Sequence, residues 1–158
     1  MLKRFWERRR DDEGFTLIEL MVVVLIIGIL IAIALPTFLG ARTRAQNRAA
    51  QSDLRTTIVA AKTIYTDASS YAGATAVGLA AIESNLTFIT AASTTGNQSV
   101  SVMTTPTATL WGAARMSASG TCYGLRETSA SGTYYITDLG TCTGDAASTD
   151  ATTVRSWT

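Results

Sequence analysis

The most marked pattern along the chain is a run of apolar residues close to its N-terminus. Sixteen consecutive apolar or glycine residues extend from Leu20 to Leu35, and only Thr16 and Glu19 interrupt the longer stretch from Phe15 with polar atoms. At a rise of 1.5 Å per residue, a helix of this length covers roughly the 30 Å of a bilayer core. The pattern predicts a membrane-spanning helix.

Beyond Pro36 the apolar residues recur at helical spacing, on one face only, among residues that favour helices. This stripe consists of Leu54, Ile58, Ala61 and Tyr65. Proline removes one backbone hydrogen bond, and since helix-favouring residues follow it, we expect Pro36 to kink the helix and not to end it. We therefore predict one helix of about 50 residues from Phe15 to near Ser69. Half of this helix is apolar all round, and half has a single apolar face.

From Gly73 onward, clusters of glycine, serine and threonine separate short runs that favour strands. The strand candidates are residues 99–103, 108–116, 122–128 and 133–139, with a hairpin turn at 129–132 and a short helical turn at 78–84. They predict an antiparallel sheet of about four strands packed against the apolar stripe. Residues 143–158 offer few apolar anchors, so we expect this tail to be loosely attached.

Composition narrows the function classes. The chain has 13 basic and 12 acidic residues and no histidine. Residues 1–14 hold five of the basic and four of the acidic residues, so the remainder is neutral and shows no basic patch of the kind that binds nucleic acid. Without histidine, the commonest general base and metal ligand are absent. We predict no enzyme activity, no metal site and no cofactor.

The two cysteines, Cys122 and Cys142, both follow the apolar segment. An even pair downstream of an export segment is typical of a disulfide in an oxidising compartment, and two free structural thiols are the alternative. Two isolated thiolates without a histidine partner make a poor zinc site.

The motif Gly14-Phe15-Thr16-Leu17-Ile18-Glu19 joins a charged segment to the apolar run. It is compatible with an ordinary secretory signal cut after Ala34, with an uncleaved anchor, or with a precursor cut between Gly14 and Phe15. Glu19 favours the third interpretation, because a carboxylate within an apolar span costs a few kcal/mol. Cleavage after Gly14 creates a positive amine on Phe15, which in a neighbouring copy can neutralise Glu19.

The segment GFTLIELMVVVLIIGILIAIALPTF resembles the N-terminus of type IV pilins and of the related type II secretion pseudopilins, over roughly residues 10–60. The resemblance implies that Gly14 precedes the prepilin peptidase cut, that Phe15 is N-methylated and that Glu19 is the assembly residue. It also matches Pro36 to the helix-kinking proline of the family, with Gly28 as a helix glycine before it. The segments TDASSYAG and LAAIESNLTF are similar to pilins of actinobacteria.

The resemblance implies an α+β type IV pilin fold with four segments. These are a leader peptide (1–14), a transmembrane and filament-core helix (15–35), an amphipathic second helix half (36–72) and a β-rich head with a disulfide loop (73–158). It also implies a membrane-anchored precursor that ends as a surface pilus. The implied partners are further copies and other pilins, a prepilin peptidase/methyltransferase, an assembly ATPase and its platform protein.

The sequence thus predicts a structural pilin subunit. One alternative is a pseudopilin of a secretion or DNA-uptake machine, which shares this N-terminus but, by resemblance, generally lacks the C-terminal disulfide loop. The other is a membrane-tethered binding module with an unprocessed anchor. Normal assembly without Glu19 would argue against the electrostatic mechanism of assembly.

Overall fold

The computed structural model describes residues 14–151 and 154–157. The chain divides into two compact units at the boundary between Ala41 and Arg42. The predictions that concern residues 1–13, including the charged leader, lie outside the described residues. The elements in chain order are α1 (Leu17–Ala68), α2 (Ala76–Ile82), β1 (Phe88–Ile89), β2 (Val100–Val102), β3 (Leu110–Met116), β4 (Cys122–Thr128), β5 (Gly132–Thr137) and α3 (Gly144–Thr149).

Helix α1 confirms the predicted single long helix. It has 52 residues and continues without a break through Pro36. It ends where Ser69 adopts a left-handed backbone conformation, with φ of 52°. The Ser69 N–H still donates to the Tyr65 carbonyl over 2.7 Å, which completes the last turn.

In the first unit, α1 is the one element of regular secondary structure among residues 14–41. It is the single helix in the described part of the chain that is long and apolar enough to cross a membrane, with a mean hydropathy of 3.1 in its most apolar window. None of that window is buried.

The second unit is built on one sheet in the order β1-β2-β3-β4-β5. The four predicted strands are confirmed as β2 to β5, and each pairs antiparallel with its neighbour in sequence. The additional strand β1 pairs parallel with β2 through Phe88 and Ile89. Two residues carry no readable alternation, which is why the sequence pattern did not indicate this strand.

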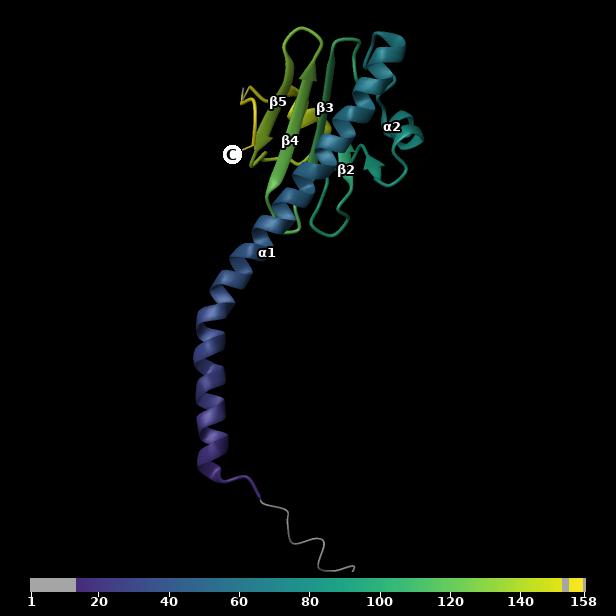
Figure 1. Cartoon of the computed structure of the whole chain (residues 1–158). Coiled ribbons are helices and arrows are strands. Elements are labelled where there is room, and N and C mark those ends of the chain that lie inside the picture. Colours follow the sequence, from purple (N-terminus) through teal and green to yellow (C-terminus); the bar gives the residue numbers. More distant parts are fainter. Residues whose placement is uncertain (1–13, 152–153, 158) are drawn as a thin grey trace, which may run out of the picture. The chain divides into compact units, whose positions relative to one another are not determined.

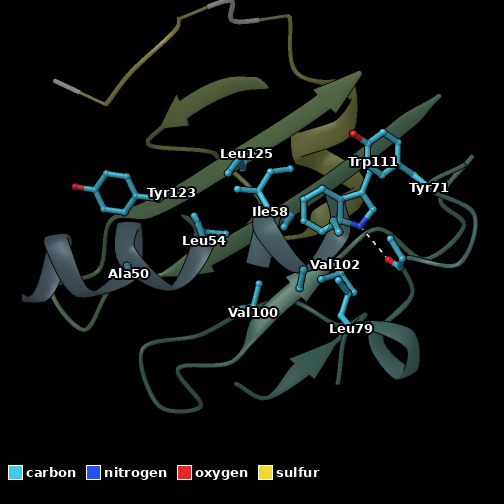
Figure 2. Packing of buried hydrophobic residues seen from close by; sticks show 14 of the residues in the cluster. Ala50, Leu54, Ile58, Tyr71, Leu79, Val100, Val102, Trp111, Tyr123 and Leu125 are labelled. Carbon is cyan, nitrogen blue, oxygen red and sulfur yellow. Dashed lines mark hydrogen bonds between the residues drawn. The ribbon is translucent and has the colours of Figure 1, made fainter. Parts of the chain in front are cut away.

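The second half of α1 packs on one face of this sheet (Figure 1). The stripe residues Leu54, Ile58 and Ala61 are buried, together with Ala50. Figure 2 shows Ile58 near Trp111, whose indole N–H donates to the Ala74 carbonyl over 2.9 Å. A buried tryptophan that satisfies its one donor in this way combines a large apolar contact with a fixed orientation.

Helix α3 covers the opposite face of the sheet. Side chains alternate along a strand, so Ala113 faces the cluster under α1 while Ala114 belongs to a second cluster with Ala147 of α3. Ala147 is buried on this face, whereas Trp157 is buried in the cluster on the α1 face. The prediction that the C-terminal tail has few anchors is therefore wrong, because small residues and one tryptophan fit where larger apolar residues were sought.

A disulfide joins Cys122, at the start of β4, to Cys142, just before α3. Both half-cystines are buried. The predicted pairing is confirmed, and the bond ties the tail to the sheet.

Replacing both cysteines with serine should lower the free energy of unfolding by about 3 kcal/mol, because the bond restricts a loop of this size in the unfolded chain. The measurement is urea unfolding of the full chain in detergent micelles, followed by circular dichroism. Dithiothreitol should destabilise the wild type by a similar amount and leave the serine variant unchanged. Equal stability of the two oxidised proteins would contradict the prediction.

A buried polar cluster joins α1 to the sheet around the carboxylate of Glu127, which is 3% exposed. The Tyr71 hydroxyl donates to Glu127 Oε1 over 3.4 Å, and the Thr133 hydroxyl donates to Oε2. Lys62 Nζ lies 3.5 Å from Oε1 and donates to Thr133 Oγ1 over 3.1 Å. The buried charge is thus compensated by one cation and two hydroxyls, as a buried carboxylate requires.

Burial, reinforced by the negative charge of Glu127, raises the pKa of Tyr71 to about 12, whereas an unfolded tyrosine titrates near pH 10. The fold therefore favours the protonated phenol. Its stabilising contribution is complete below the unfolded pKa and is lost as the pH rises through the folded one.

Between pH 10 and 12, we expect the unfolding free energy of the wild type to fall by roughly 2 kcal/mol more than that of Tyr71→Phe. The phenylalanine variant keeps the ring and has no proton to lose, so it reports every other alkaline effect. Urea unfolding at several pH values measures the difference. Parallel curves for the two proteins would show that Tyr71 is not the responsible group.

Candidate assembly site at the start of helix α1

Reciprocal hydrogen bonds between Thr16 and Glu19 close the first turn of α1. The backbone N–H and the hydroxyl of Thr16 donate to Glu19 Oε2 over 2.8 and 2.7 Å. In return, the Glu19 N–H donates to Thr16 Oγ1 over 3.2 Å. This arrangement is a capping box, with Thr16 as the N-cap and Glu19 as the third residue of the helix. The negative charge also interacts favourably with the helix dipole.

Glu19 stands out in the sequence by its charge, but its role in capping the helix was not predicted. The signal was readable, because threonine followed three residues later by glutamate, ahead of an apolar run, is the sequence pattern of a capping box. Thr16 is therefore an additional site residue. It fixes the carboxylate that the sequence singled out.

The Glu19 carboxylate keeps an acceptor free. Both bonds from Thr16 end on Oε2, and within the residues that the structure describes, Oε1 has no partner. The side chain is exposed in the isolated chain. A second donor can therefore approach the carboxylate without breaking the cap.

Gly14 and Phe15 lie just before the helix, outside regular secondary structure. Phe15 is 87% exposed, and a side chain added at Gly14 would meet no atom within 4 Å. The peptide bond between them is thus open to another molecule. Its cleavage and the methylation of Phe15 stay predictions.

The two predicted kink residues lie within continuous helix. Gly28 faces open space, with nothing within 4 Å of an added Cβ, and Pro36 stands inside α1. Their role in bending the helix stays a prediction.

An unbroken apolar surface follows Glu19 along the helix. The large apolar side chains from Leu17 to Leu39 are all exposed, at 46% or more. Exposure of such a large apolar surface to water is energetically unfavourable. Each of these side chains needs lipid or other helices around it.

The described residues contain no group of three or more acidic, cysteine or histidine side chains placed to hold a metal ion.

Comparison with known proteins matches this same region. Residues 9–35 fit the model of a family described as the prokaryotic N-terminal methylation motif. The type IV major pilin protein PilA of Myxococcus xanthus is 43% identical over 70 residues, which is 44% of this chain and 30% of that protein. The type IV wide pilus major component PilA4 of Thermus thermophilus is 36% identical over 83 residues, which is 50% of this chain and 63% of that protein.

The N-terminal part of this chain is thus similar to that of type IV pilins. The type II secretion system core protein G of Pseudomonas aeruginosa is also similar, with 43% identity over 58 residues, or 37% of this chain and 40% of that protein. The chain thus spans about a third to two thirds of the length of these relatives. No solved structure matches it significantly. These relatives are named as pilus components and as a secretion-system core protein.

Proposed function

We propose that this chain is the structural subunit of a type IV pilus, anchored in the membrane as a precursor and polymerised through the first part of α1. One observation carries the proposal: the large apolar side chains from Leu17 to Leu39 are all exposed. Lipid chains cover this apolar surface before assembly, and helices of neighbouring subunits cover it in the filament. Because both surroundings are apolar, exchange between them costs little free energy.

Processing between Gly14 and Phe15 couples the two states. The cut leaves a positive α-amine on Phe15, and the free Oε1 of Glu19 in a neighbouring subunit accepts it. The contact joins two different surfaces, so it propagates as a helical polymer and does not close into a ring. In this proposal a prepilin peptidase/methyltransferase makes the cut, and an assembly ATPase with a platform protein moves subunits into the pilus on the cell surface.

Mass spectrometry of the mature protein tests the processing step. We expect the chain to begin at Phe15 and to carry one methyl group on its α-amine. A chain that begins at Met1 or Leu35 would contradict the proposal, because neither places an amine near Glu19 of a neighbour.

A second candidate function is that of a pseudopilin, which the similarity to secretion core protein G supports. The processing test gives the same result for both functions. Electron microscopy of cells that express the chain at its native level separates them, because a pilus extends far from the envelope and a secretion pseudopilus stays short.

A further inference from the structure

A polar cleft lies in the second unit, where α1 passes the start of β4. Its volume is about 370 Å³, which is within the range of small-molecule sites. The lining side chains are Arg44, Asn47, Arg48 and Gln51 from α1, Tyr123 from β4 and Trp157 from the tail. The cleft is formed only when helix, sheet and tail come together.

Hydrogen-bond donors dominate this cleft. The carboxamide oxygen of Asn47 accepts from the hydroxyls of Ser117, over 2.8 Å, and Ser119, which leaves its amide hydrogens to bind a ligand. Figure 2 shows the Tyr123 hydroxyl pointing away from the core. Within the described residues, no hydrogen bond to that hydroxyl occurs.

The charge of the cleft is positive. Arg44 and Arg48 form no ion pair within the described residues, and no acidic side chain lines the cleft. Arg55 adds a third guanidinium nearby, 5.4 Å above the ring of Trp157. Two guanidiniums with converging amide and phenol donors suit an anion that has several oxygens, of which phosphate is the best match.

We propose that this cleft binds the phosphate of an anionic phospholipid headgroup while the chain is anchored in the membrane. Arg44 follows the exposed apolar residue Leu39 by five positions in the same helix. Side chains on a helix lean toward its N-terminus, so both arginines of the cleft lean toward the apolar end of α1. Arginine, tyrosine and tryptophan together are typical of the headgroup level of a bilayer.

The proposal rests on the proposed membrane anchoring of the chain and not on its polymerisation. Bound headgroup neutralises the cleft in the membrane. Extraction of the subunit into a filament then requires release of that lipid.

Lipid retention by the full chain tests the site. The protein in nonionic detergent micelles is mixed with phosphatidylglycerol or with phosphatidylcholine, and native mass spectrometry measures the fraction that keeps a lipid. We expect the wild type to prefer phosphatidylglycerol by about tenfold or more, since each arginine near anionic lipid contributes roughly fivefold. Arg44→Gln combined with Arg48→Gln should remove this preference, and Tyr123→Phe should weaken it.

Arg42→Gln is the matched control, because Arg42 lies two positions from Arg44, on the opposite side of the helix, and does not line the cleft. It should keep the preference. The proposal is overturned if Arg42→Gln loses as much preference as the double variant, or if millimolar inorganic phosphate displaces the lipid. It is also overturned if the double variant keeps its lipid but fails to form filaments, because the cleft would then bind a neighbouring subunit.

Flotation of each variant with vesicles separates the two proposals. Loss of flotation by the wild type would refute the membrane anchoring itself. Normal flotation without lipid preference would refute the cleft alone.

Discussion

Replacing Glu19 with glutamine or valine should abolish filaments while the chain still inserts in the membrane. A carboxylate within an apolar helix costs a few kcal/mol on insertion scales, so its removal makes insertion easier. The same change removes the acceptor for the amine of a neighbouring subunit. We expect at least a tenfold loss of filament mass, because an unpaired buried ammonium costs well over the 1.4 kcal/mol that a tenfold change represents. Electron microscopy of cells measures filaments, and membrane fractionation measures insertion.

Glu19→Gln and Thr16→Val together separate the effect of the charge from the effect of helix capping. A glutamine at position 19 keeps a carbonyl oxygen that can accept from the Thr16 N–H, so Glu19→Gln preserves the capping bond and removes only the charge. Thr16→Val does the reverse, because it removes the hydroxyl and leaves the carboxylate. We therefore expect Thr16→Val to form filaments and both Glu19 variants to fail.

Normal piliation by Glu19→Gln would refute the electrostatic part of the proposal. If Thr16→Val fails while Glu19→Gln assembles, the capping box is the essential feature and the charge is not.

Gly144→Ala should destabilise the head by more than about 3 kcal/mol, because the added Cβ has no room and the clash is with backbone. Gly144 begins α3, and its N–H donates to the Ser101 hydroxyl over 3.1 Å. A Cβ there would overlap backbone atoms of Val102 and Met103. Neither of these can move without disturbing β2.

Gly112 of β3 also lies close to the backbone of α3. A Cβ at Gly112 would lie 2.8 Å from the Ser148 backbone nitrogen. Together the two glycines allow α3 to lie directly on β2 and β3. Gly112→Ala should therefore also release α3 from the sheet.

Gly140→Ala is the matched control for these variants, because nothing lies within 4 Å of its added Cβ. Its stability should stay within about 0.5 kcal/mol of the wild type. Urea unfolding in micelles, followed by near-ultraviolet circular dichroism, measures all three. If Gly144→Ala and Gly140→Ala are equally stable, α3 does not pack as described.

The long helix and four strands were predictable because each has a period that residues display locally. The run from Leu20 to Leu35 is apolar throughout, and the stripe through Leu54 and Ile58 repeats at helical spacing. Strand β4 was predicted with its observed bounds, Cys122–Thr128. Strand β1 and helix α3 were not predicted, because Phe88–Ile89 is too short to show a period and α3 is made of small and polar residues.

The candidate sites, too, were predictable from the sequence only in part. The order of residues in the motif and the charge of Glu19 predicted Gly14, Phe15 and Glu19 as site residues. A carboxylate in an apolar run stands out without any structure. Thr16 carried a readable pattern that was overlooked. The polar cleft had no local signal, because Arg44 and Tyr123 are far apart in sequence.

By itself, the sequence determined that this chain has an apolar helix with one acid near its start, because apolarity and charge are properties of each residue in place. Only the tertiary structure decided what the second half of the chain does. In the folded chain Glu127 is a buried charge with compensating partners, Trp157 lines a basic cleft, and Gly144 allows α3 to pack on the sheet. Each of these roles depends on contacts between residues that are distant in sequence. Those contacts form only when the chain folds, and no local pattern encodes them.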